Sequence, residues 1–324
     1  MNKFRFAIMG AGNIAGKFAD AVSLLDNCEV AAVSSKSMNR AKNFAEKCGI
    51  NAFYDTYEKM LQEVKPDGVY IATTPDSHYA LTKLCMQYHV PVLCEKAMFM
   101  NSKDARDIFE DSKKNQVFVM EAMWSRFLPA VNKAKQWMKE GIIGEVNCLS
   151  MNCGCSFDRE ISKRNFDPKL GGGAAFDLTV YNYELATWFF GDEIKDMKVV
   201  SLWEENGIDS FNHVTLKYED KLAVLLSSCV TTMREELVMS GTEGKIIVPH
   251  AHFGNEVYAY DKAGNEILHY VDEETQNGFV YEIQEVVNCI GHGEIESKVV
   301  PHELTIRCAE LFDEIYRQNH KMKI

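Results

Sequence analysis

Three short stretches of the sequence carry residue types that suit chemistry on a small molecule. Residues 10–15 fit the pattern G-x-G-x-x-[GA], in which small residues let a backbone turn approach a pyrophosphate. Lys96 follows an apolar run, and a partly desolvated lysine amine can take or give a proton. Asp177 and Tyr181 follow three consecutive glycines, and a carboxylate, a phenol and an approaching lysine suit proton transfer coupled to hydride transfer.

The glycine loop stands where a dinucleotide site requires it, between an apolar run at 6–9 and apolar residues at helical spacing. Gly10 permits the tight turn, Gly12 lets the backbone approach the ligand, and Ala15 allows the helix to pack closely on the strand. The helix N-terminus supplies N–H donors and a positive dipole. An unoccupied strand–helix turn is the alternative. We predict that a dinucleotide is bound by Gly10, Gly12, Asn13 and Ile14.

The end of the second expected strand, at 30–33, indicates which dinucleotide binds. An NAD site places Asp or Glu there to hydrogen-bond the ribose hydroxyls. This chain has Ser35 and Lys36 instead, with Arg40 one turn later. Hydroxyl and cationic groups can hold a 2′-phosphate that a carboxylate would repel. We therefore predict that NADP rather than NAD binds, with its 2′-phosphate near Ser35, Lys36 and Arg40. The alternative is that Lys36 and Arg40 are solvated residues at the start of a helix and that NAD binds.

Two further stretches, at 73–78 and 94–97, follow later strands of the expected sheet. Ligands of open α/β sheets bind at the carboxyl ends of the strands. We therefore assign to the cofactor site the residues Thr73, Thr74, Pro75, His78, Glu95 and Lys96.

Asp177, Tyr181 and Glu184 fall at i, i+4 and i+7 of an expected helix at 174–190, so they share one face. Such a face is suited to hold a substrate. The alternative is that Tyr181 is an ordinary core residue.

Hydrophobic periodicity predicts the elements that position these stretches. From residue 4 to about 120, repeated strand–helix units with nearly all-apolar strands indicate a parallel sheet covered on both faces. After about residue 122, alternating strands joined by short turns indicate a mainly antiparallel sheet with one free face. The predicted fold class is α/β. A doubly wound Rossmann domain at 1–121 binds the dinucleotide, and an α/β domain with a large, open sheet at 122–324 serves substrate binding and oligomerisation.

Charge and hydropathy exclude several classes of partner. The chain has 324 residues, with 35 Lys and Arg against 47 Asp and Glu, which gives a net charge of −12. Affinity for nucleic acid and anionic membranes comes from clustered cations, so we expect neither partner. Neither a signal peptide nor an apolar run of about 20 residues is present, so we expect a cytoplasmic protein.

Ten cysteines are scattered without a C-x-x-C pair, so we interpret them as reduced and mostly buried small hydrophobes. No metal site is expected. The pairs Cys153-Gly-Cys155 and His250-Ala-His252 are typical of strand and exposed-loop residues, and a metal-dependent enzyme built on them is a weaker alternative.

Together these motifs resemble the Gfo/Idh/MocA oxidoreductase family over nearly the whole chain, in order and in spacing. Residues 121–127 and 240–244 add to the likeness. Trp124 and Arg126, with Tyr181 where many members have His, resemble the branch that contains dimeric dihydrodiol dehydrogenase and NADP-dependent D-xylose 1-dehydrogenase. The family's usual Glu-Lys-Pro is Glu95-Lys96-Ala97 here.

The resemblance implies that Lys96 and Tyr181 are an acid–base pair and that Asp177 orients the substrate. It implies that the 2′-phosphate is surrounded by Ser35, Lys36 and Arg40. It implies a substrate pocket lined by Trp124, Arg126 and Phe157, and a homodimer or homotetramer formed through the second sheet.

We therefore predict an NADP-dependent oxidoreductase that transfers a hydride between nicotinamide and a CH–OH carbon of a small sugar, cyclic polyol or dihydrodiol. The alternative is a catalytically idle, NADP-sensing regulatory protein, because the family includes transcriptional co-repressors. The presence of Lys96, Asp177 and Tyr181 favours the enzyme.

Overall fold

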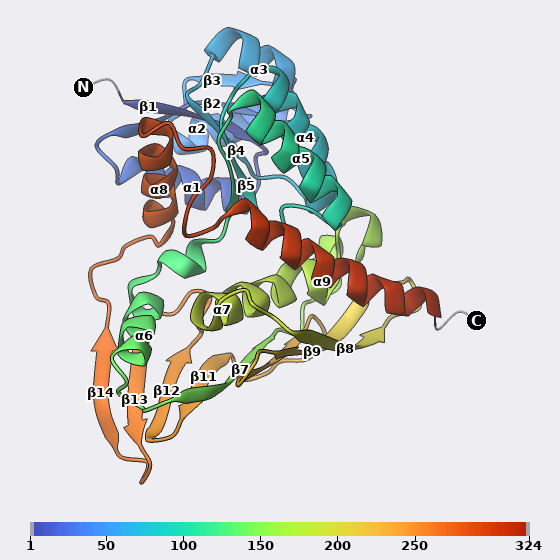
Figure 1. Cartoon of the computed structure of the whole chain (residues 1–324). Coiled ribbons are helices and arrows are strands. Elements are labelled where there is room, and N and C mark those ends of the chain that lie inside the picture. Colours follow the sequence, from blue (N-terminus) through green and yellow to red (C-terminus); the bar gives the residue numbers. More distant parts are fainter. Residues whose placement is uncertain (1–2, 322–324) are drawn as a thin grey trace. The chain divides into compact units, whose positions relative to one another are not determined.

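The computed structural model describes residues 3–321, with side chains as far as residue 318 (Figure 1). The chain divides into two compact units. One comprises the chain as far as Met123 together with Gln276–Ala309, and the other comprises Trp124–Thr275 together with the chain from Glu310 on. The boundary after Met123 lies close to the one predicted after residue 121, whereas the return of Gln276–Ala309 was not predicted. What each domain binds stays a prediction.

The first unit is built on a six-stranded parallel sheet in the order β3-β2-β1-β4-β5-β6. This is the order of a doubly wound Rossmann sheet, which confirms the predicted fold. β4, β5 and β6 are buried along their length, as their apolar runs predicted. The strands are β1 Phe4–Met9, β2 Cys28–Ser34, β3 Ala52–Tyr54, β4 Gly68–Ile71, β5 Val92–Glu95 and β6 Val119–Ala122.

Helices connect these strands, and the distant stretch of the unit adds α8 and the start of α9. α8 packs against α1, and the Asn277 side-chain amide donates to the Lys17 carbonyl at 2.9 Å. The sequence pattern did not reveal β3 or α3, because elements this short show little periodicity. The helices are α1 Asn13–Ser23, α2 Met38–Cys48, α3 Tyr57–Val64, α4 Pro75–Gln87, α5 Ser102–Asn115, α8 Phe279–Gly291 and the start of α9 His302–Lys321.

The second unit is built on an eight-stranded sheet in the order β14-β13-β12-β11-β7-β10-β9-β8. Only the β7–β10 pair is parallel, so the prediction of a mainly antiparallel sheet is confirmed for the described residues. The strands are β7 Val146–Gly154, β8 Asp196–Trp203, β9 Asp209–Lys217, β10 Leu222–Ser228, β11 Glu236–Gly241, β12 Gly244–Pro249, β13 Glu256–Asp261 and β14 Glu266–Val271.

The helical elements of the second unit lie mainly on one face of this sheet (Figure 1). They are the α-helices α6 Pro129–Lys139 and α7 Val180–Phe190, the part of α9 from Glu310 on, the 3₁₀ turns Trp124–Phe127, Lys163–Phe166 and Pro168–Leu170, and a π-helical turn at Ala175–Thr179. α7 packs against β7 and β10, and α6 packs against β12, β13 and β14. Alternate residues of each central strand are therefore buried.

The other face of the eight-stranded sheet carries exposed apolar side chains. Val200 and Leu202 of β8 are each 62% exposed, and they share this face because they lie two residues apart. Leu222, which begins β10, is 45% exposed. The sheet is therefore open on one side, as predicted.

All ten cysteines lie within the described residues and are free thiols. Seven of them are buried, which agrees with their interpretation as small hydrophobes, whereas Cys155 is exposed. Among the described residues, none of the helices combines the length and the apolar character that crossing a membrane requires.

Candidate active site

The geometry of the glycine loop explains why Gly10 is glycine and shows what surrounds Gly12. Gly10 has φ +110°, and a Cβ there would lie 2.5 Å from the Ala72 carbonyl oxygen, so any other residue would strain the turn. Gly12 precedes α1 and offers no side chain to cap it. A Cβ on Gly12 would meet nothing within 4 Å, so the backbone is open to a ligand on that side. Ala15 is fully buried against the sheet, as its predicted packing role requires.

A cavity of about 520 Å³ lies beside this loop, between α1 and α2. Its lining brings together three predicted cofactor residues, Gly12, Asn13 and Arg40. The charged side chains that line it are three cations and one carboxylate: Lys17, Arg40, Lys47 and Asp20. This excess of positive charge suits an anionic ligand such as a dinucleotide phosphate.

The other predicted cofactor residues near this end follow β2 or lie at the start of α1. Ser35 is buried after β2, Lys36 is exposed, and Ile14 is half-buried in the first turn of α1. Ser37 caps α2 by accepting the Arg40 backbone N–H at 3.5 Å, which fixes where the Arg40 side chain leaves the helix.

His78 joins the two later stretches of the predicted cofactor site. Its Nδ1 lies 3.1 Å from the Ala97 carbonyl oxygen and its Nε2 lies 3.2 Å from the Thr73 carbonyl oxygen. Burial lowers the pKa of His78 to about 4, so the ring is neutral at pH 7 and donates to one of these carbonyls. The ring therefore positions the backbone beside the half-buried Lys96. The Lys96–Ala97 peptide bond is cis.

Thr73 and Thr74 are half-buried and lead into α4, where Pro75 occupies the first turn. The Ser77 hydroxyl donates to Thr73 Oγ1 at 2.7 Å and so fixes the turn after β4. The predicted contacts of these residues with a cofactor stay predictions.

A buried group of acidic side chains lies behind Lys96, within the first unit. Glu95 accepts a hydrogen bond from the Tyr70 hydroxyl, and burial raises the pKa of Glu95. Glu282 of α8 is fully buried, and its carboxyl oxygens have no hydrogen-bond partner among the described residues. Burial, followed by the charge of Glu95, holds the pKa of Glu282 well above its usual range. Sequence reasoning missed Tyr70 and Glu282, because no local pattern connects them to Glu95.

Glu121, at the end of β6, joins the first unit's two stretches of chain. Its Oε1 accepts the Met98 backbone N–H at 2.8 Å, and its Oε2 accepts the Thr305 hydroxyl at 2.8 Å. The loop after Lys96 is therefore tied to the start of α9.

In the second unit, the glycine-rich stretch leads into a π-helical turn rather than the continuous α-helix predicted at 174–190. Gly173 has φ +110°, and a Cβ there would lie 2.2 Å from Asp209 Oδ1. The Asp209 carboxylate accepts the Ala175 backbone N–H at 2.6 Å. Burial raises the pKa of Asp209 to about 6. Asp209 was missed from the sequence because it lies far along the chain from the turn that it holds.

The π-helical turn carries Asp177, whose carboxylate is held by two side chains of the preceding loop. Arg164 lies 3.0 Å from Asp177 Oδ1, and the Asn165 amide donates to Oδ2 at 2.7 Å. Asp177 is half-buried, so the carboxylate is fixed in orientation while part of it faces solvent. Its predicted contact with substrate stays a prediction.

Tyr181, in the first turn of α7, is 8% exposed and lies beside Trp124. The Trp124 indole N–H donates to the Tyr181 hydroxyl at 3.3 Å, and the ring of His252 lies 4.8 Å from the Tyr181 ring. Phe157, another predicted pocket residue, is half-buried and packs against a cluster that contains Cys153 and Leu178. The structure therefore brings Trp124 and Tyr181 together within the second unit.

Arg126 and Glu184 form a buried ion pair. Arg126 is 4% exposed, its Nε lies 3.0 Å from Glu184 Oε2, and its guanidinium also donates to the Thr187 hydroxyl at 2.7 Å. Glu184 therefore binds Arg126, whereas Asp177 on the same predicted face binds Arg164. The guanidinium is committed to this pair, and the predicted contact of Arg126 with substrate stays a prediction.

Two profiles of one protein family match this chain. Residues 4–123 match the one described as an oxidoreductase family with an NAD-binding Rossmann fold, and residues 131–247 match the GFO/IDH/MocA C-terminal domain.

Curated relatives match over nearly the full length. The trans-1,2-dihydrobenzene-1,2-diol dehydrogenase of Mus musculus is 30% identical, with 96% of this chain and 95% of the relative covered. The enzyme of the same name from Danio rerio is 29% identical, with 97% and 96% covered.

Solved structures share the fold. An aldose–aldose oxidoreductase from Caulobacter crescentus, complexed with glycerol, superposes with a TM-score of 0.88 at 20% identity, covering 99% of this chain and 98% of that one. A 3-ketoreductase from Actinomadura kijaniata, in complex with NADP and TDP-benzene, superposes with a TM-score of 0.87 at 20% identity, covering 96% of each chain.

The buried Glu282 makes the stability of the protein depend on pH. An unfolded glutamate loses its proton near pH 4.3, whereas folded Glu282 keeps its proton to higher pH, so the folded state loses stability as the pH rises above about 4.3. Glu282→Gln removes this loss. We expect the variant to melt about 2 °C or more above the wild type at pH 8, with a smaller difference at pH 5, in thermal unfolding followed by circular dichroism.

Glu110→Gln, at an exposed position of α5, is the matched control and should melt like the wild type at both pH values. A Glu282→Gln variant that melts below the wild type at pH 8, or whose difference from it is the same at pH 5, would contradict the interpretation.

The Arg126–Glu184 pair should be costly to break. Arg126→Met leaves the Glu184 carboxylate buried without its cation, so the free energy of unfolding in urea should fall by about 3–5 kcal/mol. The double variant Arg126→Met/Glu184→Leu removes both charges and should recover most of the loss. A single variant within about 1 kcal/mol of the wild type would show that the pair does not stabilise the unit.

Proposed function

The chain belongs to the GFO/IDH/MocA oxidoreductase family, and from this membership we propose that it is an NADP-dependent dehydrogenase or reductase acting on a CH–OH group of a sugar, cyclic polyol or dihydrodiol. The observation that carries the proposal is the arrangement of the parallel sheet. The glycine loop, Ser35, Thr73 and Lys96 follow β1, β2, β4 and β5, so all four lie at the carboxyl edge where such sheets bind ligands.

The residues at the dinucleotide end fit NADP. The open side of Gly12 and the cationic cavity beside α1 suit the pyrophosphate. Ser35, Lys36 and Arg40 would hold the 2′-phosphate, and no carboxylate directly follows β2 to repel it. Thr73, Thr74, Pro75, His78 and Glu95 would line or support the rest of the cofactor site.

In the proposed reaction, bound NADP supplies or accepts the hydride. Tyr181 moves the proton of the substrate hydroxyl, and the Lys96 amine assists it. The Trp124 indole N–H, which already donates to the Tyr181 hydroxyl, would stabilise a phenolate there. Asp177, fixed by Arg164 and Asn165, would orient a substrate hydroxyl, and Trp124, Arg126 and Phe157 would surround the substrate.

The proposal is tested by a spectrophotometric screen of aldoses, inositols and cyclic diols, with NADP and NAD in parallel. We expect turnover with NADP and less with NAD. Equal or better turnover with NAD would contradict the role of Lys36, and no turnover with any member of the panel would favour the idle, cofactor-sensing alternative.

Variants of the proposed acid–base pair test the mechanism. Tyr181→Phe and Lys96→Met should each lower kcat by about 100-fold or more while the Kd for NADPH, followed by its fluorescence, stays largely unchanged. Tyr79→Phe and Lys42→Met remove the same groups from a half-buried position of α4 and an exposed position of α2, and both variants should keep wild-type turnover. Wild-type turnover in both Tyr181→Phe and Lys96→Met would overturn the assignment.

We also propose self-association through the open face of the eight-stranded sheet, as a homodimer or homotetramer. The exposed apolar side chains of Val200 and Leu202 support it, because burying each could contribute about 1.5–3 kcal/mol. Sedimentation velocity should show an oligomer for the wild type and smaller species for Leu202→Glu. Leu24→Glu, at a 47% exposed position of the first unit, should sediment like the wild type. A monomeric wild type at micromolar concentration would refute the proposal.

A further inference from the structure

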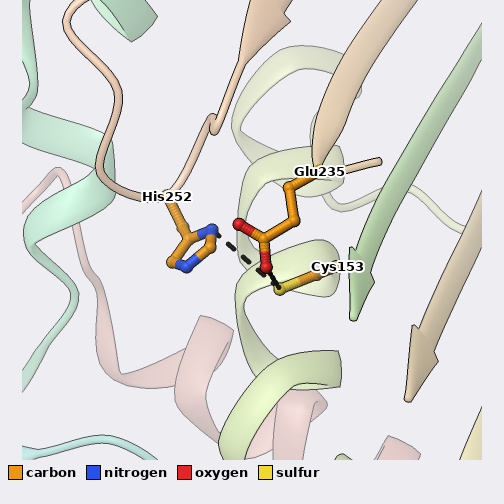
Figure 2. Close-up of side chains that lie close together, drawn as sticks. All are labelled: Cys153, Glu235 and His252. Atoms are coloured by element: carbon orange, nitrogen blue, oxygen red, sulfur yellow. Dashed lines mark hydrogen bonds between the residues drawn. The ribbon is translucent and has the colours of Figure 1, made fainter. Parts of the chain in front are cut away.

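Three side chains with metal-ligating atoms converge at one end of the eight-stranded sheet (Figure 2). They are Cys153, Glu235 and His252, whose ligand atoms all lie within 4.8 Å of one another. Cys153 lies near the end of β7, Glu235 directly precedes β11, and His252 lies in the loop between β12 and β13. All three belong to the second unit. They therefore meet without any movement of one unit against the other.

The sheet register explains why two of these side chains face each other. β7 and β11 are antiparallel, with Asn152 opposite Glu236, so the next residue pair along the ladder is Cys153 and Glu235. Residues that face each other across such a ladder have side chains on the same side of the sheet. The Cys153 side chain is on the helix-covered face, where it packs against Leu178. The β12–β13 loop then brings His252 over the same point.

The two distances from the sulfur to the other ligand atoms are close to those that a bound metal requires. Cys153 Sγ lies 3.9 Å from Glu235 Oε1 and 3.9 Å from His252 Nδ1. In a tetrahedral Zn²⁺ site, Zn–S of about 2.3 Å and Zn–N of about 2.0–2.1 Å place sulfur and nitrogen about 3.6 Å apart. Glu235 and His252 are half-buried and can make the remaining small adjustment. The sulfur itself is buried, so the ion would enter from the side of these two residues.

The donor set selects the class of ion. A thiolate, an imidazole and one carboxylate suit Zn²⁺ and similar divalent transition metals, whereas Mg²⁺ and Ca²⁺ prefer oxygen ligands. The thiolate and the carboxylate together balance the two positive charges of the ion, which lowers the cost of placing it in a half-buried position. Three protein ligands leave the fourth tetrahedral position for water or another ligand.

Neighbouring side chains hold two of the ligands in place. The second oxygen of Glu235 lies 3.3 Å from His250 Nδ1, so the carboxylate is oriented by a residue that does not itself reach Cys153. The His252 ring packs against the rings of both Phe253 and Tyr181. Outer partners of this kind fix the orientation of metal ligands.

We propose that Cys153, Glu235 and His252 form a binding site for one divalent transition-metal ion of the Zn²⁺ type. The inference goes beyond the proposed function, which uses no metal, and its test does not depend on activity. Each of the two sequence pairs that had suggested a weaker, metal-dependent alternative contributes one ligand, and Glu235, which has no sequence motif, contributes the third.

The experiment uses the full chain, stripped with a chelator and kept reduced. Equilibrium dialysis against Zn²⁺ alone should give one tightly bound ion per chain. Titration with Co²⁺ should give a near-ultraviolet thiolate-to-cobalt band together with the visible bands of a four-coordinate site. Cys153→Ser should abolish the thiolate band and weaken Zn²⁺ binding by at least about 10-fold. Removing a residue that only supports a metal ligand already weakens binding by about this much, so removing a ligand itself should cost no less.

Glu235→Gln and His252→Gln, at half-buried positions, test the proposal if the buried Cys153→Ser variant is unstable. Each of them should also weaken Zn²⁺ binding by at least about 10-fold. Cys155→Ser, two residues away at an exposed position, is the matched control and should keep both the stoichiometry and the band. Less than one ion per chain, or a thiolate band that survives in Cys153→Ser or is lost in Cys155→Ser, would overturn the proposal. The contacts at Cys153 would then be weak thiol hydrogen bonds only.

Discussion

The buried carboxylate of Asp209 determines where the glycine-rich entry into α7 lies. It accepts the backbone N–H of Ala175, the side-chain amide of Asn212 and the hydroxyl of Tyr316, so three separate segments converge on one side chain. Gly173 leaves the room that this carboxylate needs. A polar group buried this deeply is tolerated only when its partners are in place. The geometry of the candidate substrate residues therefore depends on the whole second unit being folded.

Local patterns were enough to predict most of the fold. Around residues 6–25, an apolar strand followed by apolar residues at helical spacing can be recognised from a dozen or so neighbouring residues. The alternation of buried and less buried residues in β9 is a local pattern of the same kind. The pattern did not reveal β3, which has three residues, or the π-helical turn at Ala175–Thr179. That turn is held by Asp209, which lies too far along the chain for a pattern of hydrophobic periodicity to include it.

The candidate site was predictable where a residue acts through its own neighbours along the chain, and not where its partner is distant. The need for Gly10 follows from the turn that it makes, and the place of Lys96 follows from the strand before it. The partner of Arg126 could not be predicted, because an ion pair with Glu184 depends on how two helical segments pack. The same holds for Glu282 beside Glu95, since no spacing in the sequence relates them.

The parallel-sheet unit is not one uninterrupted piece of chain, because Gln276–Ala309 supplies α8 and the start of α9 to it. A fragment that stops at Met123 would lose the Thr305 hydroxyl that bonds to Glu121 and the His302 ring that stacks on Phe109. It would also expose to water the side of α1 that α8 covers. To excise this unit for study or for grafting onto another protein, the two stretches must be joined by a linker in place of residues 124–275.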